Sequence, residues 1–276
     1  MPNHGNICIA DHEYKHLISN TQVICSIVNF RPIFSIGVEY SAVEQEHMEN
    51  ISGTKHRIYS ESEKNQLKLV SQLLDEGETG LDILMDWMSQ LGQSDNLALG
   101  KAYQSLYLNG NPRIQQFLAD RYPYGVVQLN SERNIDYQPL QQLLAQQDFQ
   151  GADVVTLQKL CELAGPAAKM RKWLYFTEVE SIPVADLQTI DRLWLMSSEG
   201  KFGYSVQRRI WLSVGKNFSQ LWTKIDWKSG NSWTRYPKEF TWDLSAPKGH
   251  LPLSNQLRGV RVLDAIFAHP AWNTPK

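Results

Sequence analysis

Residues 99–118, LGKAYQSLYLNGNPRIQQFL, hold the signals that decide the fold class. In the first half of this stretch, apolar side chains recur three and four positions apart, which predicts a helix. Gly110 ends that pattern, and Asn111 followed by Pro112 is typical of the start of a second helix. Two helices joined by so short a turn pack against each other in antiparallel directions. The stretch therefore predicts a helical hairpin.

The same helical period continues on both sides of this hairpin, and the sequence nowhere alternates as a strand does. The fold class predicted is all-α. Residues 1–60 lack a useful period and are polar over 41–62, so we expect them to be disordered. A small helical bundle is expected at 61–135, and a second all-helical domain at 136–276. Further helices are expected near 67–74, 81–91, 140–144, 152–161, 183–194, 206–214 and 218–225, with a last helix capped by Ser254 and closed before Pro270.

Bulk composition excludes several classes of protein. The chain has 276 residues, of which 42% are hydrophobic and 20% charged, as in ordinary globular proteins. Its apolar runs stay below the roughly 18 residues that a membrane-spanning helix needs, and its start does not resemble a secretory signal. The three cysteines, Cys8, Cys25 and Cys161, have no zinc or redox spacing and suit a reducing compartment.

Charge is divided unevenly along the chain. Residues 201–276 contain 12 Lys and Arg against 4 Asp and Glu, although the whole chain has a net charge of −2. A basic C-terminal region indicates either a solvated face or an anionic partner, such as nucleic acid, a membrane surface or a carboxylate ligand.

Motifs for catalysis are missing from the sequence. We find no phosphate-binding glycine loop, no nucleophile elbow and no paired histidines at helical metal-binding spacing. Nothing indicates a positioned acid–base pair either. The sequence therefore predicts a protein that is not an enzyme.

Aromatic residues gather in one region. Five of the nine tryptophans are Trp211, Trp222, Trp227, Trp233 and Trp242. The first two fall on predicted helices and are expected in the core. Trp233 and Trp242 belong, with Tyr236 and Phe240, to a long segment without period, 228–252, and loops that face water seldom carry such side chains. This segment is expected to form a wall for a flat apolar ligand or a docking surface for a protein.

Cationic groups follow the aromatic segment. Asn255 is expected in the first turn of the last helix, where backbone N–H groups favour anions. Arg258 and Arg261 are three apart and share a face, and guanidinium groups bind carboxylates in a forked geometry. A porphyrin, with a flat apolar face and two propionates, matches an aromatic wall beside two arginines. The alternatives are that the arginines pair with Asp264 and other acids, or that nucleic acid is the anion.

Long ordered strings in the second domain resemble the genomes uncoupled four family of magnesium-chelatase regulators. They are KLCELAGP at 159–166, WLYFTEV at 173–179, FGYSVQ at 202–207, FTWDLSAP at 240–247, GHLP at 249–252 and NQLRG at 255–259. The resemblance is dense over 139–272 and looser over 61–135.

The resemblance implies a cupped all-helical domain that binds protoporphyrin IX and magnesium protoporphyrin IX, stimulates magnesium chelatase and has no catalytic activity. Cyanobacterial members of this family have a tryptophan where this chain has Tyr236. The porphyrin-binding residues expected are Phe176, Val179, Trp233, Tyr236, Phe240, Leu251, Asn255, Arg258 and Arg261.

Metal, partner and location follow from the same resemblance. We expect no metal site in the protein itself. The magnesium of a bound porphyrin would take water or the Asn255 amide oxygen, rather than His250, as its fifth ligand. The partners expected are porphyrin and the porphyrin-binding large subunit of magnesium chelatase, with peripheral membrane association and no nucleic acid. The chain ends soon after Trp272, without the extension of plant members. This implies the cytoplasm of a cyanobacterium or the plastid stroma, with peripheral association at the thylakoid. A tetrapyrrole-modifying enzyme and a protein-docking module are the alternatives left open.

Overall fold

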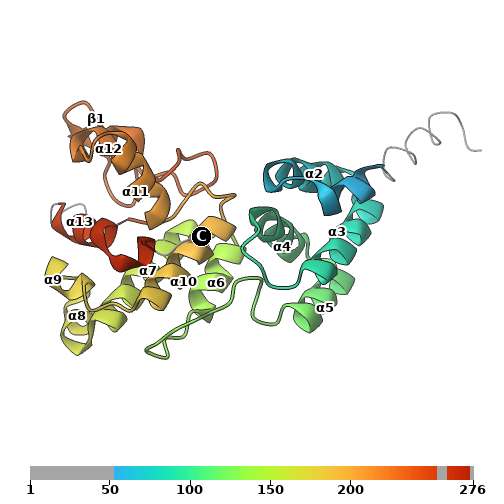
Figure 1. The fold of residues 1–276 in the computed structure, drawn as a ribbon, viewed down its shortest axis with the longest axis horizontal. Coiled ribbons are helices and arrows are strands. Elements are labelled where there is room, and N and C mark those ends of the chain that lie inside the picture. Colours follow the sequence, from blue (N-terminus) through green and yellow to red (C-terminus); the bar gives the residue numbers. More distant parts are fainter. Residues whose placement is uncertain (1–52, 254–259, 274–276) are drawn as a thin grey trace, which may run out of the picture.

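A computed structural model describes residues 53–253 and 260–273 of the chain. Its elements form two groups of helices that lie side by side (Figure 1). The first group contains α2 (Glu63–Asp75), α3 (Gly77–Leu91), α4 (Leu97–Asn109) and α5 (Pro112–Arg121). The prediction of an all-α fold is confirmed: in the described residues, strands are limited to two short segments.

Local signals set the hairpin of α4 and α5. The Asn96 side chain accepts hydrogen bonds from the first N–H groups of α4, and Asn111 does the same for α5. Between them, Gly110 ends α4 with φ +73°, a backbone conformation that glycine adopts without steric cost. Pro112 occupies the first turn of α5, where its missing N–H is not needed. The predicted hairpin is present as expected.

The N-terminal boundary differs from the prediction. Residues 53–60, expected to be disordered, are helical. The side chain of Ile58 is fully buried in the core, and the side-chain amide of Gln66 donates to the Ile58 carbonyl at 2.8 Å. A single buried apolar residue anchors this turn, which is too short a pattern for periodicity to detect. Residues 1–52 lie outside the described part of the chain.

The second group of helices follows a segment, 131–137, that is held in place by one buried carboxylate. Asp186 accepts hydrogen bonds from the Ser131 hydroxyl at 2.5 Å, the Glu132 N–H at 2.9 Å and the Tyr137 hydroxyl at 2.8 Å. This segment between the two groups of helices is therefore ordered. The helices after it are α6 (Gln138–Ala145), α7 (Phe149–Ala164), α8 (Pro166–Arg171), α9 (Phe176–Val179), α10 (Val184–Met196), α11 (Tyr204–Ser213), α12 (Phe218–Lys224) and α13 (Arg261–Ala268).

The aromatic segment joins α12 to the final part of the chain. It contains β1 (Lys228–Ser229) and β2 (Ser232–Trp233), which pair in an antiparallel hairpin, and otherwise has no regular structure. After α13, a single 3-10 turn, η2 (Pro270–Trp272), packs against α10. The predicted helix cap, Ser254, lies outside the described residues. None of the helices in the described residues is long and apolar enough to cross a membrane.

The two groups share one core, and α4 makes the junction. Gly100 packs directly on the end of α10: a Cβ at this position would lie 2.2 Å from the Met196 carbonyl oxygen. The side-chain amide of Gln104 donates to the carbonyls of Leu144 and Ser197 at 2.8 and 3.1 Å, and Lys101 pairs with Glu199. The bundle is therefore an integral support of α6 and α10.

Candidate functional site

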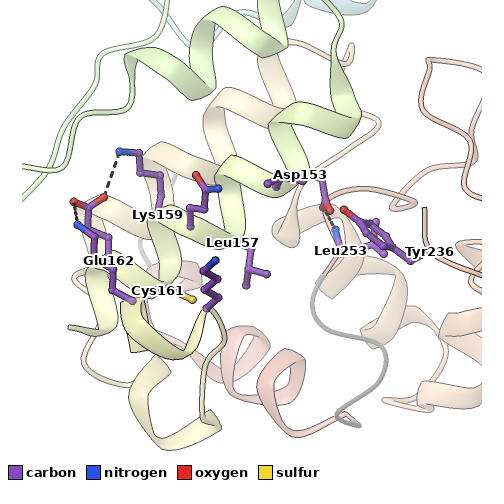
Figure 2. A pocket seen from close by; sticks show the side chains of 11 residues that line it. Asp153, Leu157, Lys159, Cys161, Glu162, Tyr236 and Leu253 are labelled. Carbon is purple, nitrogen blue, oxygen red and sulfur yellow. Dashed lines mark hydrogen bonds and ion pairs between the residues drawn. The ribbon is translucent and has the colours of Figure 1, made fainter. Parts of the chain in front are cut away.

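A pocket of about 610 Å³ opens along α7 (Figure 2). Most of its wall is one side of that helix, and the rest comes from the region around α8, from the aromatic segment and from the residues that precede the undescribed segment 254–259. The lining residues are Asp153, Val154, Leu157, Gln158, Lys159, Cys161, Glu162, Lys169, Lys172, Tyr236 and Leu253. Its size lies within the range of small-molecule and cofactor sites.

Helix α7 positions the wall through its own period. Asp148 caps the helix by accepting the Gly151 N–H at 2.8 Å. From there Asp153, Leu157 and Cys161 follow four apart, so their side chains lie in one row along the pocket. The row begins with a carboxyl group and continues with apolar side chains. Burial raises the pKa of the Cys161 thiol to about 11, so this group is neutral and acts as part of the apolar wall.

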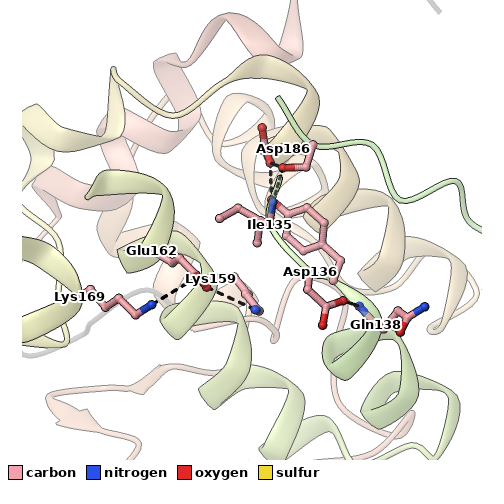
Figure 3. Close-up of polar contacts among 9 residues, drawn as sticks. Ile135, Asp136, Gln138, Lys159, Glu162, Lys169 and Asp186 are labelled. Carbon is pink, nitrogen blue, oxygen red and sulfur yellow. Dashed lines mark hydrogen bonds and ion pairs between the residues drawn. The ribbon is translucent and has the colours of Figure 1, made fainter. Parts of the chain in front are cut away.

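Lysines line one end of the pocket. Lys159 and Lys169 both pair with Glu162 at 3.3 Å (Figure 3). Burial opposes ionisation of Glu162, but the two ammonium groups prevail and lower its pKa. Lys172 is exposed and makes no ion pair with any residue that the structure describes. This end therefore has cationic charge in excess of its one carboxylate, and suits an acidic group.

Asp153 marks the opposite end. Its Oδ1 atom accepts the backbone N–H of Leu253 at 2.7 Å, which ties α7 to the end of the aromatic segment. Burial raises the pKa of this carboxyl group to about 7, although the Leu253 N–H works in the other direction. Tyr236 lies beside this end of the pocket (Figure 2). The pocket is thus polar at both ends and apolar between them.

Tyr236 is presented to the pocket by other aromatic rings. It meets Phe240 and Trp242 edge to face, with centroids 6.2 and 5.9 Å away, and is itself 47% exposed. Phe240 packs in turn on the fully buried Trp227, which stacks on Trp222 at 5.2 Å with the ring planes 4° apart. The segment therefore has a rigid aromatic base and an exposed ring at the pocket.

His250 belongs to this aromatic base, and both of its ring nitrogens are hydrogen-bonded. Its Nδ1 lies 2.7 Å from the Ile225 carbonyl, and its Nε2 accepts the Thr241 N–H at 3.2 Å. The ring is fully buried, and burial lowers its pKa. These bonds require the neutral ring with the proton on Nδ1. Such a ring does not ligate a metal without giving up one of these hydrogen bonds.

A second pair of predicted residues meets at the junction of α9 and α13. The Arg261 guanidinium lies 5.4 Å from the centre of the Phe176 ring, and both side chains are exposed. The turn that carries Phe176 is braced by Glu178, which accepts two hydrogen bonds from Arg171 at 2.8 and 2.7 Å and one from the Tyr175 N–H. Neither Phe176 nor Arg261 is among the residues that line the α7 pocket.

The remaining predicted site residues have varied positions. Val179 and Leu251 are fully buried in the core, so they support the site without a surface for a ligand. Trp233 is exposed on β2 under the Lys228 ammonium group, at 5.4 Å. Asn255 and Arg258 lie outside the described residues.

The sequence reasoning did not detect the α7 wall or the lysines. It predicted a helix near 152–161 but assigned no side of that helix to a ligand. However, Val154 and Leu157 extend the apolar surface to a second side of the helix, and such a helix needs a second neighbour. The width of this apolar surface was the feature of the sequence that could have indicated a ligand-facing wall. Leu253 and Tyr236 are distant from α7 in sequence, and only the tertiary fold brings them to the same pocket.

Among the described residues, no cluster of His, Cys, Asp or Glu is arranged to hold a metal ion. The pocket suits a ligand of moderate size with an apolar body, a carboxylate end and a hydrogen-bonding group near Asp153. A tetrapyrrole with propionate side chains satisfies the first two requirements.

Comparison with known proteins gives consistent matches. A family model described as GUN4-like matches residues 130–270, and one described as an ARM-like repeat domain, GUN4-N terminal, matches residues 42–123. The chain is 51% identical over 227 residues to the Ycf53-like protein of Synechocystis sp. The aligned region covers 82% of this chain and 97% of that protein. It is 42% identical over 144 residues to the chloroplastic tetrapyrrole-binding protein of Arabidopsis thaliana, over 49% of this chain and 54% of that one. The structure of GUN4 from Chlamydomonas reinhardtii is similar with a TM-score of 0.51 and 44% identity, over 54% of this chain and 95% of that chain.

Proposed function

Because this chain belongs to the GUN4-like family, we propose that it binds a tetrapyrrole in the α7 pocket. Membership confirms the resemblance noted in the sequence. The ligands proposed are protoporphyrin IX and magnesium protoporphyrin IX, and the role proposed is to stimulate magnesium chelatase without catalysis of its own. The name of the Arabidopsis relative, a tetrapyrrole-binding protein, supports the ligand class.

The observation that carries this proposal is the shape and polarity of the pocket. An apolar wall on α7 faces the exposed ring of Tyr236, and lysines stand at one end. Burial of several hundred Å² of macrocycle would contribute on the order of 10 kcal/mol before the costs of binding. The lysines then supply charge for propionates. The lysines form a cationic end of the pocket. We retain Asn255, Arg258 and Arg261 as further proposed contacts for the propionates.

The proposed site is larger than the pocket alone. Phe176 and Arg261 lie at the α9–α13 junction. Val262 and Ile266 of α13 line a small cavity together with Leu157 and Leu253, which also line the pocket. Trp233 and Phe240 are proposed as parts of the aromatic wall, the first exposed and the second as its base. An arginine-edged surface next to an apolar pocket suits a ligand whose acidic tails extend past the wall.

The experiment that tests binding is a porphyrin titration of the full chain, followed by quenching of its clustered tryptophans. We expect saturable quenching by protoporphyrin IX and much weaker quenching by its dimethyl ester, which lacks the carboxylates. A full chain that folds but shows no saturable quenching with either porphyrin would contradict the proposal.

Chelatase stimulation and location are separate parts of the proposal. We propose contact with the porphyrin-binding large subunit, in the cytoplasm of a cyanobacterium or the plastid stroma, with peripheral association at the thylakoid. The test is the initial rate of magnesium insertion by the purified chelatase with and without this chain. An unchanged rate over a range of porphyrin concentrations would leave a binding protein with another role. Appearance of a new porphyrin product without chelatase would favour the enzyme alternative.

One observation favours the protein-docking alternative. Met170 is 84% exposed, and Tyr175 beside Phe176 is also exposed. Exposed large apolar side chains are a feature of surfaces that contact another protein. Under the proposed function this surface would face the chelatase. Met170→Lys is therefore expected to reduce stimulation while porphyrin quenching is unchanged.

A further inference from the structure

We propose that the lobe formed by α11, α12 and the β1–β2 hairpin is the surface with which this protein lies on a membrane that contains anionic lipid. The inference rests on one part of the proposed function, the peripheral association, and names the surface and the lipid chemistry that provide it. It does not depend on the binding of a tetrapyrrole.

The charge of this lobe is strongly one-sided. Residues 208–240 contain seven Lys and Arg against two Asp and Glu. Several of these cations are exposed, namely Arg209, Lys216, Lys224, Arg235 and Lys238. Helix α12 packs on α11 and on β1, and Figure 1 shows α12 and β1 at an extremity of the molecule. A cationic extremity attracts an anionic surface.

A row of aromatic rings runs through the lobe. Trp211 contacts Phe218, and Phe218 contacts Trp222, with the ring centroids 5.4 Å apart in both pairs. Trp222 contacts Trp233 in turn, at 6.0 Å. Phe218 is partly buried and Trp233 is 46% exposed. The row therefore begins in the core and ends at an exposed ring on the hairpin.

A lysine lies beside each end of this row. The Lys216 N–H donates to the Trp211 carbonyl at 2.9 Å, and the Lys216 ammonium group lies 5.7 Å from the centre of the Trp211 ring. On the hairpin, Lys228 and Trp233 are paired across the two strands, with the ammonium group 5.4 Å from the ring centre. Attraction between each cation and its ring keeps the two charges beside the aromatic row.

This combination suits a lipid surface better than an acidic protein. Tryptophan is enriched at the membrane–water interface, where lysine also keeps its ammonium group among the headgroups while its stem contacts apolar atoms. The cations are distributed over two helices and a hairpin, and attraction to a uniformly charged surface requires no fixed geometry of its donors. Trp233 is proposed as the exposed edge of the aromatic wall, but it does not line the α7 pocket, so its ring is accessible to lipid.

The test is co-sedimentation of the full chain, without porphyrin, with two kinds of vesicle. One is phosphatidylcholine alone, and the other is phosphatidylcholine and phosphatidylglycerol in equal parts. We expect saturable binding to the anionic vesicles that weakens with salt, and little binding to the others. Lys216→Gln combined with Lys228→Gln should bind the anionic vesicles roughly thirtyfold more weakly, since each cation near such a surface contributes about a factor of five. Lys216→Arg combined with Lys228→Arg keeps both charges and should bind as the parent does. Trp233→Ala should lose the part of the binding that remains at high salt.

The matched control is Lys64→Gln combined with Lys68→Gln, which removes the same charge from exposed positions on α2 and should bind as the parent does. Thermal unfolding checks that each variant folds. Equal losses in the two Gln double variants would overturn the inference, because net charge alone would then explain the binding. A parent that binds neither kind of vesicle, or both equally, would also overturn it and would favour an acidic protein as the partner of the lobe. A parent that binds the anionic vesicles but shows no quenching by porphyrin would overturn the proposed ligand and support this inference.

Discussion

The carboxyl group of Asp153 in α7 accepts the backbone N–H of Leu253 at 2.7 Å, across one hundred residues of sequence. This bond joins the helix that forms the pocket wall to the end of the aromatic segment that faces it. It also keeps a carboxyl group in a buried place where ionisation is unfavourable. A group in such a position costs stability, and functional sites are where proteins retain such groups.

Asp153→Asn is expected to stabilise the protein at pH 8. The Asp153 pKa rises from an ordinary 3.8 to about 7 on folding. Between these values the unfolded chain loses the proton and the folded chain keeps it, so the free energy of unfolding falls as pH rises through this window. The variant has no carboxyl group at this position, so its free energy of unfolding does not fall in this way. Thermal unfolding at pH 4, 6 and 8 should show its advantage grow with pH, by about 1–3 kcal/mol, and be small at pH 4. An advantage that is the same at all three values would contradict the raised pKa.

Lys172→Ala is expected to weaken porphyrin binding about two- to fivefold, because an exposed charge contributes roughly 0.5–1 kcal/mol to an ion pair. Lys172 lines the pocket and makes no ion pair with the described residues, so its ammonium group is available to a propionate. Quenching titrations at low and high salt measure the effect, which should diminish as salt screens the charge. Lys68→Ala, an exposed lysine on α2, is the control. Equal effects of the two substitutions would indicate a non-specific contribution of net charge.

Tyr236→Trp is expected to increase porphyrin affinity by roughly 0.5–1.5 kcal/mol, because the larger ring adds contact with the macrocycle. Tyr236 is 47% exposed and meets Phe240 and Trp242 by its edge, which leaves room for a larger ring. Tyr236→Ala should lose more than this, since the wall would open to water. Trp233→Ala, exposed nearby but absent from the pocket lining, should change affinity less than Tyr236→Ala. Three equal affinities for Tyr, Trp and Ala at 236 would place this side chain away from the ligand.

Gly100→Ala is expected to destabilise the protein even though alanine is the better helix former by about 1 kcal/mol. Its Cβ would lie 2.2 Å from the Met196 carbonyl oxygen, so α4 and α10 would have to separate. A net loss of about 1–3 kcal/mol is expected from such overpacking. Thermal unfolding measures it, with Ser105→Ala on the same helix as the control. A rise in melting temperature for Gly100→Ala would show that the junction adjusts without cost.

His250 is expected to titrate below pH 6.5. Burial lowers its pKa, although the Ile225 carbonyl bonded to the ring favours the protonated form. As pH falls below 6.5, the unfolded chain takes up a proton that the folded ring does not, so the free energy of unfolding decreases until the folded ring titrates as well. NMR titration of the His250 ring measures this directly. A midpoint at or above pH 6.5, or a shift of the midpoint on adding magnesium porphyrin, would argue that the ring is free to ligate metal.

The sequence by itself determined most of the helices, their order and the aromatic segment, because those features are local, but it did not predict the short helices α8 and α9. Asn111 and Pro112 start α5 through hydrogen bonds and φ restrictions that extend only a few residues. Trp222 and Trp227 are apolar enough to demand burial wherever the chain places them. Local signals did not predict the helical residues 53–60, because the one buried apolar residue there, Ile58, forms no periodic pattern.

Only the tertiary structure decided which residues meet in the pocket. Leu157 could face core or ligand by periodicity alone, and the choice depended on Tyr236 and Leu253, which arrive from distant parts of the chain. The same holds for Asp153: its pKa depends on burial and on one backbone N–H, neither of which composition or spacing reveals. Phe176 and Arg261 came together as a pair because α9 and α13 pack against each other, while Val179 and Leu251 turned inward. Long-range packing and desolvation act between segments far apart in sequence, so they become visible only when the chain has folded.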